Sequence, residues 1–396
     1  MMEKKCIVLG ICGGIAAYKM ADLASQLTKE GHDVHVIMTK NATEFITPLT
    51  FETLTGNRCM IDTFARDFEW DVKHVSIAKR ADVFLVAPAT ANVVAKMACG
   101  IADDMLTTTL LAARCPILVS PSMNTAMYEN PMTQRNLETL RQAGYQVIEA
   151  ESGVLACKDV GKGRLPKVSV LYQWVMNALY PKKDLAGKKV VVTAGPTCES
   201  VDPVRYLTNH STGKMGYALA QAAWQRGAQV VLISGKTSLE APVGPEVISV
   251  WSAADMFEAV KKEAANADFV IKAAAVADFT PADTAEQKIK KSGESGMELH
   301  LTRTQDILSY LGTHKPAGQK LCGFSMETEN LVENSRKKLE KKQADLIVAN
   351  SLRQEGAGFG VDTNRITLIT HQGIEELPLM SKQEAAHRVL DCLNSL

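Results

Sequence analysis

Three side chains with chemically useful groups lie in or beside predicted loops in the first half of the chain. Cys157 lies in a glycine-rich segment from Gly153 to Pro166, Asn124 closes the polar loop PSMN, and His74 begins a predicted helix. In an open parallel sheet, the loops after successive strands converge on one crevice. Taken singly, these residues are more typical of a small side chain, a turn and a helix cap. The prediction of a site therefore depends on their convergence.

A glycine-rich turn near the N-terminus is the predicted anion site. Residues 5–9 indicate a buried strand, Gly10 to Gly14 a tight turn and residues 15–30 a helix. Such a turn directs backbone N–H groups at an anion, usually a phosphate. The spacing is not GxGxxG, and the next strand, 34–38, ends in Thr39 where an NAD site carries an acidic residue. The pattern favours a single-phosphate cofactor such as FMN, with glycines kept only for close helix packing as the alternative.

Two further predicted strands end in loops that could contact this cofactor. The strand 83–87 is followed by PATAN at 88–92, and the strand 116–120 by PSMN at 121–124. Threonine and asparagine side chains of the first loop could hold polar groups of a flavin. The segment from Gly153 to Pro166 precedes a predicted helix at 168–179 and has the composition of a mobile lid.

The first half resembles the FMN-dependent cysteine decarboxylases, most closely the phosphopantothenoylcysteine decarboxylases of coenzyme A synthesis. The resemblance spans residues 4–180 and is carried by GICGGIAAYK, HVSIAKRAD, APATAN, GIADDMLTT, PSMN and LACKDVGKGR. It implies His74 as an active-site base or orienting group, Asn124 as the residue that holds the substrate carboxylate, and Cys157 as the proton donor. The FMN contacts that it implies are Gly13, Gly14, Ile15, Thr39, Pro88, Ala89, Thr90 and Asn92. The family's usual PAMN reads PSMN here, and its usual ACGD reads ACKD, which places Lys158 beside the cysteine.

The reaction implied by this resemblance suits a flavin. A cysteine carboxylate has no electron sink, so the thiol-bearing carbon is first oxidised to a thioaldehyde, after which carbon dioxide can leave. The resulting enethiolate is returned to the thiol level by the reduced flavin, while Cys157 donates a proton. No nicotinamide is consumed, which agrees with the missing acidic residue after Met38.

The second half repeats the alternation of strand and helix after a short charged linker, 181–188. Residues 189–193 and 229–234 are predicted strands, with a loop and a helix at 215–226 between them. The segment STGKMG is not a P-loop, because Met215 stands where Ser or Thr should follow, but its backbone could still bind a phosphate. Lys338 and Lys342 are four residues apart on one helical face, where they could meet a polyphosphate, although such lysines are usually solvated.

This half resembles the phosphopantothenate:cysteine ligases over residues 187–395. The resemblance is carried by GPTCESVDPVRYLTNHSTGKMG, AAAVADF, KIKK, GFSMET and ADLIVAN, and the order of the two halves is that of bifunctional bacterial enzymes. The implied ligase uses CTP to convert 4'-phosphopantothenate into an acyl-cytidylate, which the amine of L-cysteine attacks. Its product, phosphopantothenoylcysteine, is the substrate of the first half.

The resemblance also implies roles for residues of the second half. Asn209 would serve the acyl-adduct step, Lys288 would act in catalysis, and Asp278 would contact the nucleotide or its Mg2+. The implied CTP contacts are Ala273, Ala274, Ala275, Asp278, Lys288, Thr304, Gln305, Asp306, Ile307, Phe324, Lys338 and Lys342. The loop usually written NPDI reads TQDI here, which puts its nucleotide contacts in question.

Length and composition bound the fold. A chain of 396 residues suggests two domains, which we place at 1–180 and 189–396. The expected class is α/β, with two Rossmann-like doubly wound domains of mainly parallel sheets: a flavodoxin-like FMN domain and a nucleotide-binding ligase domain. A formal net charge of zero argues against a nucleic-acid partner, and nine cysteines without CxxC or zinc-type spacing indicate reduced thiols.

The remaining expectations concern location and assembly. No apolar run reaches the roughly 18 residues of a membrane span, and glycines interrupt the one N-terminal run that could pass for a secretion signal. We therefore expect a cytoplasmic protein without a membrane partner. The resemblance implies a homo-oligomer, with trimers of the flavin domain and dimers of the ligase domain, which a dodecamer could combine. The rival hypotheses are a flavin-binding regulator without catalysis and a tandem nicotinamide dehydrogenase.

Overall fold

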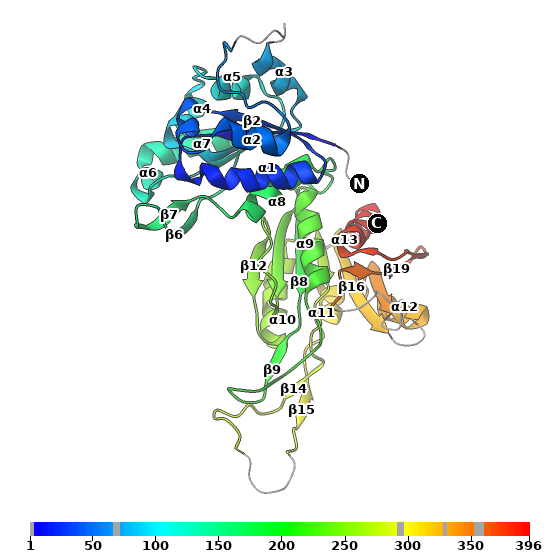
Figure 1. Ribbon diagram of the computed structural model, residues 1–396. Coiled ribbons are helices and arrows are strands. Elements are labelled where there is room, and N and C mark those ends of the chain that lie inside the picture. The colour runs from blue at the N-terminus through cyan, green and yellow to red at the C-terminus, as the bar shows by residue number, and fades with distance from the viewer. Residues whose placement is uncertain (1–3, 66–71, 291–296, 328–330, 352–359) are drawn as a thin grey trace. The chain divides into compact units, whose positions relative to one another are not determined.

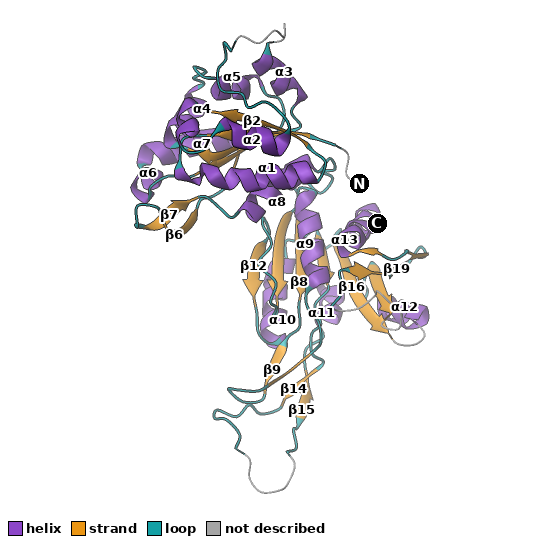
Figure 2. Ribbon diagram, in the orientation of Figure 1, coloured by secondary structure: helices purple, strands orange, loops and turns teal. Residues whose placement is uncertain are grey.

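The computed structural model describes residues 4–65, 72–290, 297–327, 331–351 and 360–396. The chain forms two compact units, Met1–Pro181 and Lys182–Leu396. Each unit combines a mainly parallel sheet with helices (Figures 1 and 2). Two residues of the predicted motifs, Lys291 of KIKK and Thr328 of GFSMET, lie outside the described residues.

The first unit is built on a five-stranded parallel sheet with the strand order β2-β1-β3-β4-β5. Its strands are β1 (Cys6–Ile11), β2 (Asp33–Met38), β3 (Val83–Ala89), β4 (Ile117–Pro121) and β5 (Gln146–Val147). This order is the flavodoxin-like one, in which the direction of winding reverses between β1 and β3. The predicted fold class of the first half is therefore confirmed.

Helices cover both faces of this sheet. They are η1 (Ile15–Tyr18), α1 (Lys19–Lys29), η2 (Lys40–Glu44), α2 (Pro48–Thr55), α3 (Lys73–Arg80), α4 (Ala91–Cys99), α5 (Met105–Ala112), α6 (Thr125–Glu129), α7 (Pro131–Gln142) and α8 (Val168–Leu179). Strand alternation sends Ile7 and Leu9 into the core shared with α1, α2 and α8, and Val8 into the core shared with α3, α4, α5 and α7. Both faces of β1 are buried, which explains its continuous apolar run.

The predicted lid is a β-hairpin instead of an irregular loop. Strands β6 (Glu151–Val154) and β7 (Val160–Arg164) pair antiparallel, and residues 155–159, including Cys157, form the turn between them. The prediction of a loop was wrong because glycines in the strands obscured the alternation that identifies a hairpin from sequence, whereas the role as a mobile lid stays a prediction.

The second unit contains an eight-stranded sheet with the order β12-β11-β8-β13-β16-β17-β19-β20. The first six are parallel: β8 (Lys189–Ala194), β11 (Gln229–Ser234), β12 (Glu246–Ser249), β13 (Phe269–Lys272), β16 (Lys320–Glu327) and β17 (Leu346–Ser351). Counted along the chain, they have the Rossmann order 3-2-1-4-5-6, which confirms the predicted class. The edge strands β19 (Ile366–Thr370) and β20 (Ile374–Glu376) are antiparallel.

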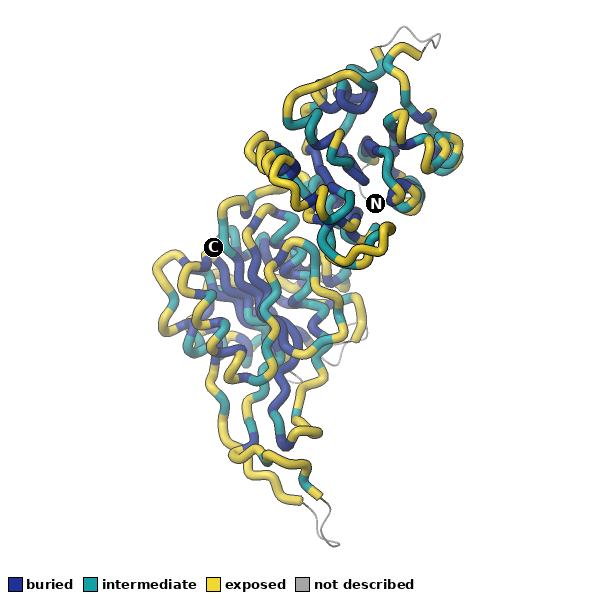
Figure 3. Tube along the Cα trace, turned by 90° about the vertical axis from the view of Figure 1, so that its left-hand side faces the viewer, coloured by how far each residue is buried: buried dark blue, intermediate teal, exposed yellow. Residues whose placement is uncertain are grey.

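In the described part of this unit, five helices and three short strand pairs accompany the sheet. The helices are α9 (Lys214–Gln225), α10 (Ala253–Ala264), α11 (Ile307–His314), α12 (Leu331–Lys341) and α13 (Lys382–Ser395). The pairs are β9 (Cys198–Ser200) with β10 (Tyr206–Thr208), β14 (Phe279–Pro281) with β15 (Leu301–Arg303), and β18 (Thr363–Asn364) with β21 (Met380–Ser381). The sheet strands form the buried interior of the unit (Figure 3). In the described part of the chain, no helix is both long and apolar enough to cross a membrane.

The segment 181–188, which we expected to be a linker, belongs largely to the second unit. Leu185 is fully buried in the core that contains α9 and α13. Asp184 accepts a hydrogen bond from Nε of Arg226 at 2.8 Å, and Arg226 is itself fully buried. The guanidinium also reaches Asp391 at 3.0 Å. An apolar side chain and a buried ion pair thus fix residues that the charge and composition had presented as a free tether.

Asp184→Asn should lower the free energy of unfolding of the second unit by about 2 kcal/mol at neutral pH. The hydrogen bond from Arg226 lowers the pKa of Asp184 from 3.8 to about 2. A depressed carboxyl pKa stabilises the fold above the unfolded value, and this stabilisation is lost as the pH falls from about 4 towards 2. Chemical denaturation followed by circular dichroism should therefore show a difference between the variant and the wild type that shrinks over this range.

Glu333→Gln is the matched control for this prediction. Glu333 pairs with Lys337 on an exposed helix face, with 66% and 71% of the side chains accessible. Because solvent screens both side chains, such a pair contributes little to stability. If both variants unfold like the wild type at neutral pH, the Asp184–Arg226 pair does not stabilise the unit.

Candidate functional site

Cys157, Asn124 and Asp159 form one hydrogen-bonded group in the first unit. The amide Nδ2 of Asn124 lies 3.4 Å from Sγ of Cys157 and 2.8 Å from Oδ2 of Asp159. The thiol in turn donates to the same carboxylate oxygen at 3.3 Å. Cys157 is exposed in the hairpin turn, and Asn124 follows β4 at its carboxyl end. A carboxylate beside an exposed thiol can exchange a proton with it, as a proton-donating cysteine requires.

Glycines allow the hairpin to approach the loop that carries Asn124. A Cβ added at Gly163 would lie 2.3 Å from the carbonyl oxygen of Met123, and one added at Gly161 would lie 2.6 Å from the side chain of Thr125. The N–H of Met123 donates to the carbonyl of Gly163 at 3.0 Å. The sequence GKG in β7 is therefore what brings the turn with Cys157 against the PSMN loop.

Asp159 is a site residue that sequence reasoning missed. Its position, two residues after Cys157 in ACKD, was the available signal. Lys158, which replaces the glycine of the usual ACGD, has a φ of +70°. Glycine adopts this left-handed conformation without the steric cost that lysine incurs, so the departure from ACGD affects the backbone. The charged group that contacts the thiol is Asp159.

The three glycines of the first turn differ in their surroundings. A Cβ at Gly10 would lie 2.6 Å from Leu106, and one at Gly13 would lie 2.6 Å from Cβ of Asn41. These two positions fit the packing alternative. Gly14 is different, since the nearest atom to its Cβ would be Cγ of Pro88, 4.0 Å away. The free space lies between the ends of β1 and β3, at the switch point where doubly wound sheets bind ligands.

The residues around this space fit a flavin phosphate. The Oγ1 atom of Thr39, at the end of β2, is buried and has no hydrogen-bond partner in the described structure. Thr90 caps α4 by accepting a hydrogen bond from Val93 N–H at 3.4 Å. Ile15 is 60% exposed at the start of η1, where unpaired helix N–H groups can face an anion. FMN would be held by the amides at Gly14 and Ile15, and by Thr39.

Pro88 and Ala89 are buried at the end of β3, not in the loop that we predicted, and Asn92 is exposed on α4.

His74 is half-buried near the start of α3. In the described structure, no hydrogen bond or ion pair joins His74 to Asn124 or Cys157. Its role stays a prediction.

In the second unit, the segment after β13 is held to its neighbours by hydrogen bonds. The N–H of Ala275 donates to Gly195 O at 3.0 Å, and the N–H of Ala277 donates to Oγ1 of Thr197 at 3.0 Å. Nδ2 of Asn209 donates to the carbonyl of Ala275 at 3.0 Å. Asn209 thus lies beside the AAAVADF segment, as expected for residues of one site.

The TQDI loop and two lysines meet at the same edge of the sheet. Thr304 donates from its N–H to Asp278 O at 3.0 Å and from Oγ1 to Ala277 O at 2.6 Å. Asp306 caps α11 and pairs with Lys342. Lys338 donates to the carbonyl of Phe324 at 3.0 Å. Despite the change from NPDI to TQDI, the loop therefore meets the AAAVADF segment and the lysines.

Gly312 explains how Lys342 reaches Asp306. A Cβ at Gly312 would lie 1.8 Å from the carbonyl oxygen of Lys342, so only glycine allows α11 to pack so closely against the end of α12. Of the remaining predicted contacts, Ile307 is buried, whereas Gln305 is exposed.

The side chain of Lys288 is exposed. The backbone of the next residue, Ile289, is fixed by two hydrogen bonds. The N–H of Ile289 donates to Oδ2 of Asp202 at 3.1 Å, and Arg205 donates to the carbonyl of Ile289 at 2.7 Å. The hydrogen bond from Arg205 is the leading cause that lowers the pKa of Asp202.

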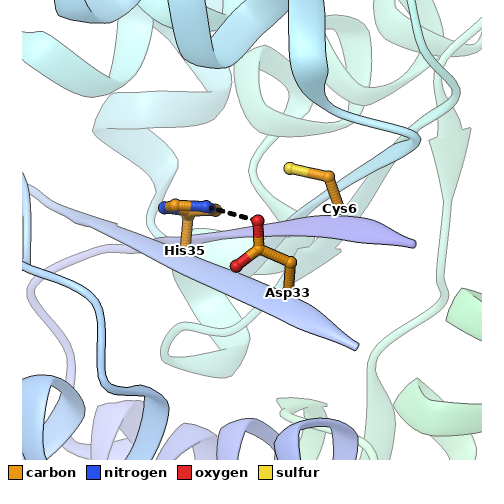
Figure 4. Close-up of side chains that lie close together, drawn as sticks. All are labelled: Cys6, Asp33 and His35. Carbon is orange, nitrogen blue, oxygen red and sulfur yellow. Dashed lines mark hydrogen bonds and ion pairs between the residues drawn. The ribbon is translucent and has the colours of Figure 1, made fainter. Parts of the chain in front are cut away.

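One group of three potential metal ligands occurs in the described part of the chain: Cys6, Asp33 and His35 (Figure 4). The carboxylate of Asp33 lies 3.1 Å from Nε2 of His35 and 2.8 Å from the guanidinium of Arg80. Burial raises the pKa of the Cys6 thiol to about 11. Since Arg80 already balances the charge of the carboxylate, we assign this group a structural role. It does not contain Asp278, the predicted metal ligand.

Family comparisons agree with this division of the chain. The flavoprotein family matches residues 1–179, and the family described as DNA/pantothenate metabolism flavoprotein C-terminal domain matches residues 185–396. The fold and these matches define a two-domain α/β flavoprotein of pantothenate metabolism.

Curated relatives match over the full length. The coenzyme A biosynthesis bifunctional protein CoaBC of Bacillus subtilis (strain 168) is 49% identical over 400 residues, covering 100% of this chain and 98% of the relative. The protein of the same name from Vibrio vulnificus (strain YJ016) is 44% identical, covering 99% of this chain and 98% of the relative. The chain therefore belongs to the family of bifunctional coenzyme A biosynthesis proteins, which confirms the resemblance found in its motifs.

Solved structures resemble each half. The C-terminal domain of a CoaBC protein is 43% identical with a TM-score of 0.46, covering 53% of this chain and 96% of that structure. The FMN-dependent cysteine decarboxylase SpaF is 33% identical with a TM-score of 0.39, covering 44% of this chain and 97% of that structure.

Gly163→Ala should separate the hairpin from the PSMN loop. Its Cβ would meet the Met123 carbonyl, and φ at this position is +143°. Strain of this kind costs about 1–3 kcal/mol, which corresponds to roughly 10-fold to 100-fold faster hydrogen exchange at the Met123 amide. Gly144→Ala is the control, because φ is +89° and nothing lies within 4 Å of its Cβ. Equal exchange at Met123 in the two variants would contradict the close approach.

Proposed function

We propose that the chain catalyses two consecutive steps of coenzyme A synthesis. The second unit joins 4'-phosphopantothenate to L-cysteine at the expense of CTP, and the first unit decarboxylates the product, phosphopantothenoylcysteine, to 4'-phosphopantetheine. The observation that carries the proposal is the hydrogen-bonded group of Asn124, Cys157 and Asp159 at the carboxyl edge of a flavodoxin-like sheet. Full-length similarity to bifunctional relatives supports the pairing with a ligase.

In the first unit, the residues position a carboxylate and move a proton. Asn124 would orient the substrate carboxylate with its amide, which donates to Cys157 and Asp159. Bound FMN would supply a reversible two-electron oxidation of the substrate. Cys157 then donates a proton to the substrate carbon, and Asp159, 3.3 Å from the sulfur, can return a proton to the thiol. His74 is the proposed additional base or orienting group.

In the second unit, lysines at the sheet edge would neutralise the nucleotide phosphates. Lys338 and Lys342 lie on α12 and at its end, next to the cap of α11. Asp278, which is exposed beside them, is the proposed ligand of Mg2+. Charge neutralisation is needed because a carboxylate becomes an acyl donor only after nucleotide activation, which releases pyrophosphate. We propose that Asn209, bound to the AAAVADF segment, acts on the activated acyl group.

We further propose that the protein is a homo-oligomer in which the flavin units form trimers and the ligase units form dimers. We also propose that it acts in the cytoplasm. Exposed apolar side chains support such contacts in each unit. They include Leu49 (68%) and Val160 (77%) in the first unit, and Phe279 (48%) and Leu301 (45%) on the β14–β15 pair.

Cys157→Ser should release carbon dioxide but form little phosphopantetheine. A serine hydroxyl is a much weaker acid than a thiol, so the protonation that follows decarboxylation should stall and leave an oxidised enethiol product. Carbon dioxide release, flavin absorbance and mass spectrometry of the products would test this. Cys99→Ser changes another exposed thiol and should behave like the wild type. Normal phosphopantetheine yields from Cys157→Ser would exclude the proton-donor role.

Lys288→Gln should reduce ligation by roughly 100-fold to 1,000-fold, as expected when one charge that stabilises the transition state is lost. It should also prevent acyl-cytidylate formation, whereas Asn209→Asp, which affects a later step, should let the adduct accumulate. Pyrophosphate release and trapped adduct would be measured with cysteine first withheld and then supplied. Lys290→Gln removes another exposed charge from the same segment and serves as the control. If Lys288→Gln catalyses ligation as fast as Lys290→Gln, Lys288 is an ordinary solvent-exposed lysine without a catalytic role.

A further inference from the structure

Lys272 is a charged residue at the centre of the parallel sheet of the second unit. It ends β13, where it pairs with Thr193 of β8 and Gly323 of β16. The preceding residues of this strand, 269–271, are all buried. Lysine is uncommon in such a place because its ammonium loses hydration there. The boundary between β8 and β13 is also the switch point of the Rossmann order, so Lys272 ends its strand where this sheet type binds ligands.

Strand alternation determines which helices Lys272 faces. Val270, two residues earlier, packs in the core that includes residues of α10, α11 and α12, so Lys272 is directed to the same face of the sheet. On the neighbouring strand, a Cβ at Gly323 would lie 2.7 Å from Leu308. Glycine at this position therefore lets α11, whose cap is Asp306, approach the end of the sheet beside Lys272.

Four charged groups act on Lys272: Lys338, Lys342, Asp306 and Asp278. Lys342 is paired with Asp306, and Lys338 donates to the carbonyl of Phe324. In the described structure, by contrast, the side chain of Lys272 has neither a hydrogen bond nor an ion pair. Lys272 is half-buried as a residue, yet loss of hydration around its ammonium, and next the positive charge of Lys338, lower the pKa of Lys272 to about 8. A lysine kept only for stability would be expected to have a partner, whereas one kept for a ligand need not.

We propose that Lys272 is an anion-binding residue of the ligase site, where its ammonium contacts the triphosphate of the nucleotide and stabilises the charge on the leaving pyrophosphate. This inference rests on the ligase activity proposed above. In that step, a carboxylate oxygen of 4'-phosphopantothenate forms a bond to the α-phosphorus of CTP. The bond from this phosphorus to the bridging oxygen breaks, and its electron pair leaves with pyrophosphate. A fixed cation at the switch point lowers the energy of that developing charge.

Lys272→Met separates this role from a structural one. Methionine keeps the length of the apolar stem and removes the charge, so the nucleotide-free variant should unfold at the same temperature as the wild type or at a higher one. Its affinity for Mg2+–CTP, measured by calorimetry, should fall roughly 10-fold to 100-fold, as expected for the loss of one hydrogen bond to a charged group. Pyrophosphate release with 4'-phosphopantothenate should fall at least as much. Flavin absorbance and decarboxylation of phosphopantothenoylcysteine should not change.

Lys320→Met is the matched control. Lys320 begins the neighbouring strand β16 at the opposite edge of the sheet, where it donates to the carbonyl of Leu396 at 3.1 Å. This variant should bind CTP like the wild type. Two results would overturn the inference: CTP affinity of Lys272→Met within about twofold of the wild type, or a clearly lowered unfolding temperature together with the loss of affinity, which would indicate a structural lysine.

The wild type supplies a test that does not depend on folding of a variant. Mg2+–CTP should protect Lys272, but not Lys320, from acetylation by acetic anhydride, as read by mass spectrometry of peptides. Equal labelling of Lys272 with and without the nucleotide would contradict the proposal. Failure of the wild type to release pyrophosphate from CTP would overturn both the ligase function and this inference. Normal release by the wild type and by Lys272→Met would overturn the inference alone.

Discussion

Parallel strand pairing is the constraint on which both candidate sites depend, because it brings the ends of separate strands to one edge of a sheet. In the first unit, Gly14, which follows β1, and Pro88, near the end of β3, border the same open space. In the second, Thr193 and Lys272 are paired neighbours at the ends of β8 and β13. The residues in each pair are far apart in sequence, and only the sheet brings them together. Glycines then set how closely the other elements approach, at Gly163 for the hairpin and at Gly312 for α11.

The sequence predicted what depends on periodicity and on long motifs. The strand and helix alternation gave the doubly wound class of both halves, and continuous apolar runs such as Ile7–Leu9 correctly indicated strands buried on both faces. Motif residues such as Asn124 and Cys157, or Asn209 and Ala275, do lie together. The hairpin of β6 and β7 escaped prediction because its glycines resemble those of a loop.

Other features escaped prediction because they depend on distant contacts. Nothing local distinguishes Asp159 from an ordinary surface carboxylate until the hairpin folds against Asn124. Leu185 could not be recognised as a core residue, since the α9 and α13 residues with which it packs lie far along the chain. For His74 and Lys288 the situation is reversed. Motif similarity predicts a functional role for each, but the described contacts of these side chains do not indicate one.

Two charged clusters in the chain differ in how their charges are balanced. Burial alone would raise the pKa of the Asp33 carboxyl, but hydrogen bonds from Asn57 and His35 hold this pKa below its usual value. The carboxylate also forms an ion pair with Arg80. Every acceptor there has a donor, which is typical of a structural group. At the end of β13, two lysines and two aspartates balance one another around Lys272, so the positive charge of Lys272 itself is the excess. The contrast separates charge that stabilises the fold from charge suited to an incoming anion.

The burial of Leu185 and the pairing of Asp184 with Arg226 have a consequence for how a gene for both activities could arise or divide. The boundary of the second unit lies ahead of its first sheet strand, since a stand-alone ligase beginning at Lys189 would lose an apolar side chain from its core and leave Arg226 without one of its two carboxylates. Recombination at the start of β8 would therefore produce a damaged ligase, whereas a break at Pro181 would preserve it. The segment that connects the two units in sequence is therefore structurally part of the second unit alone.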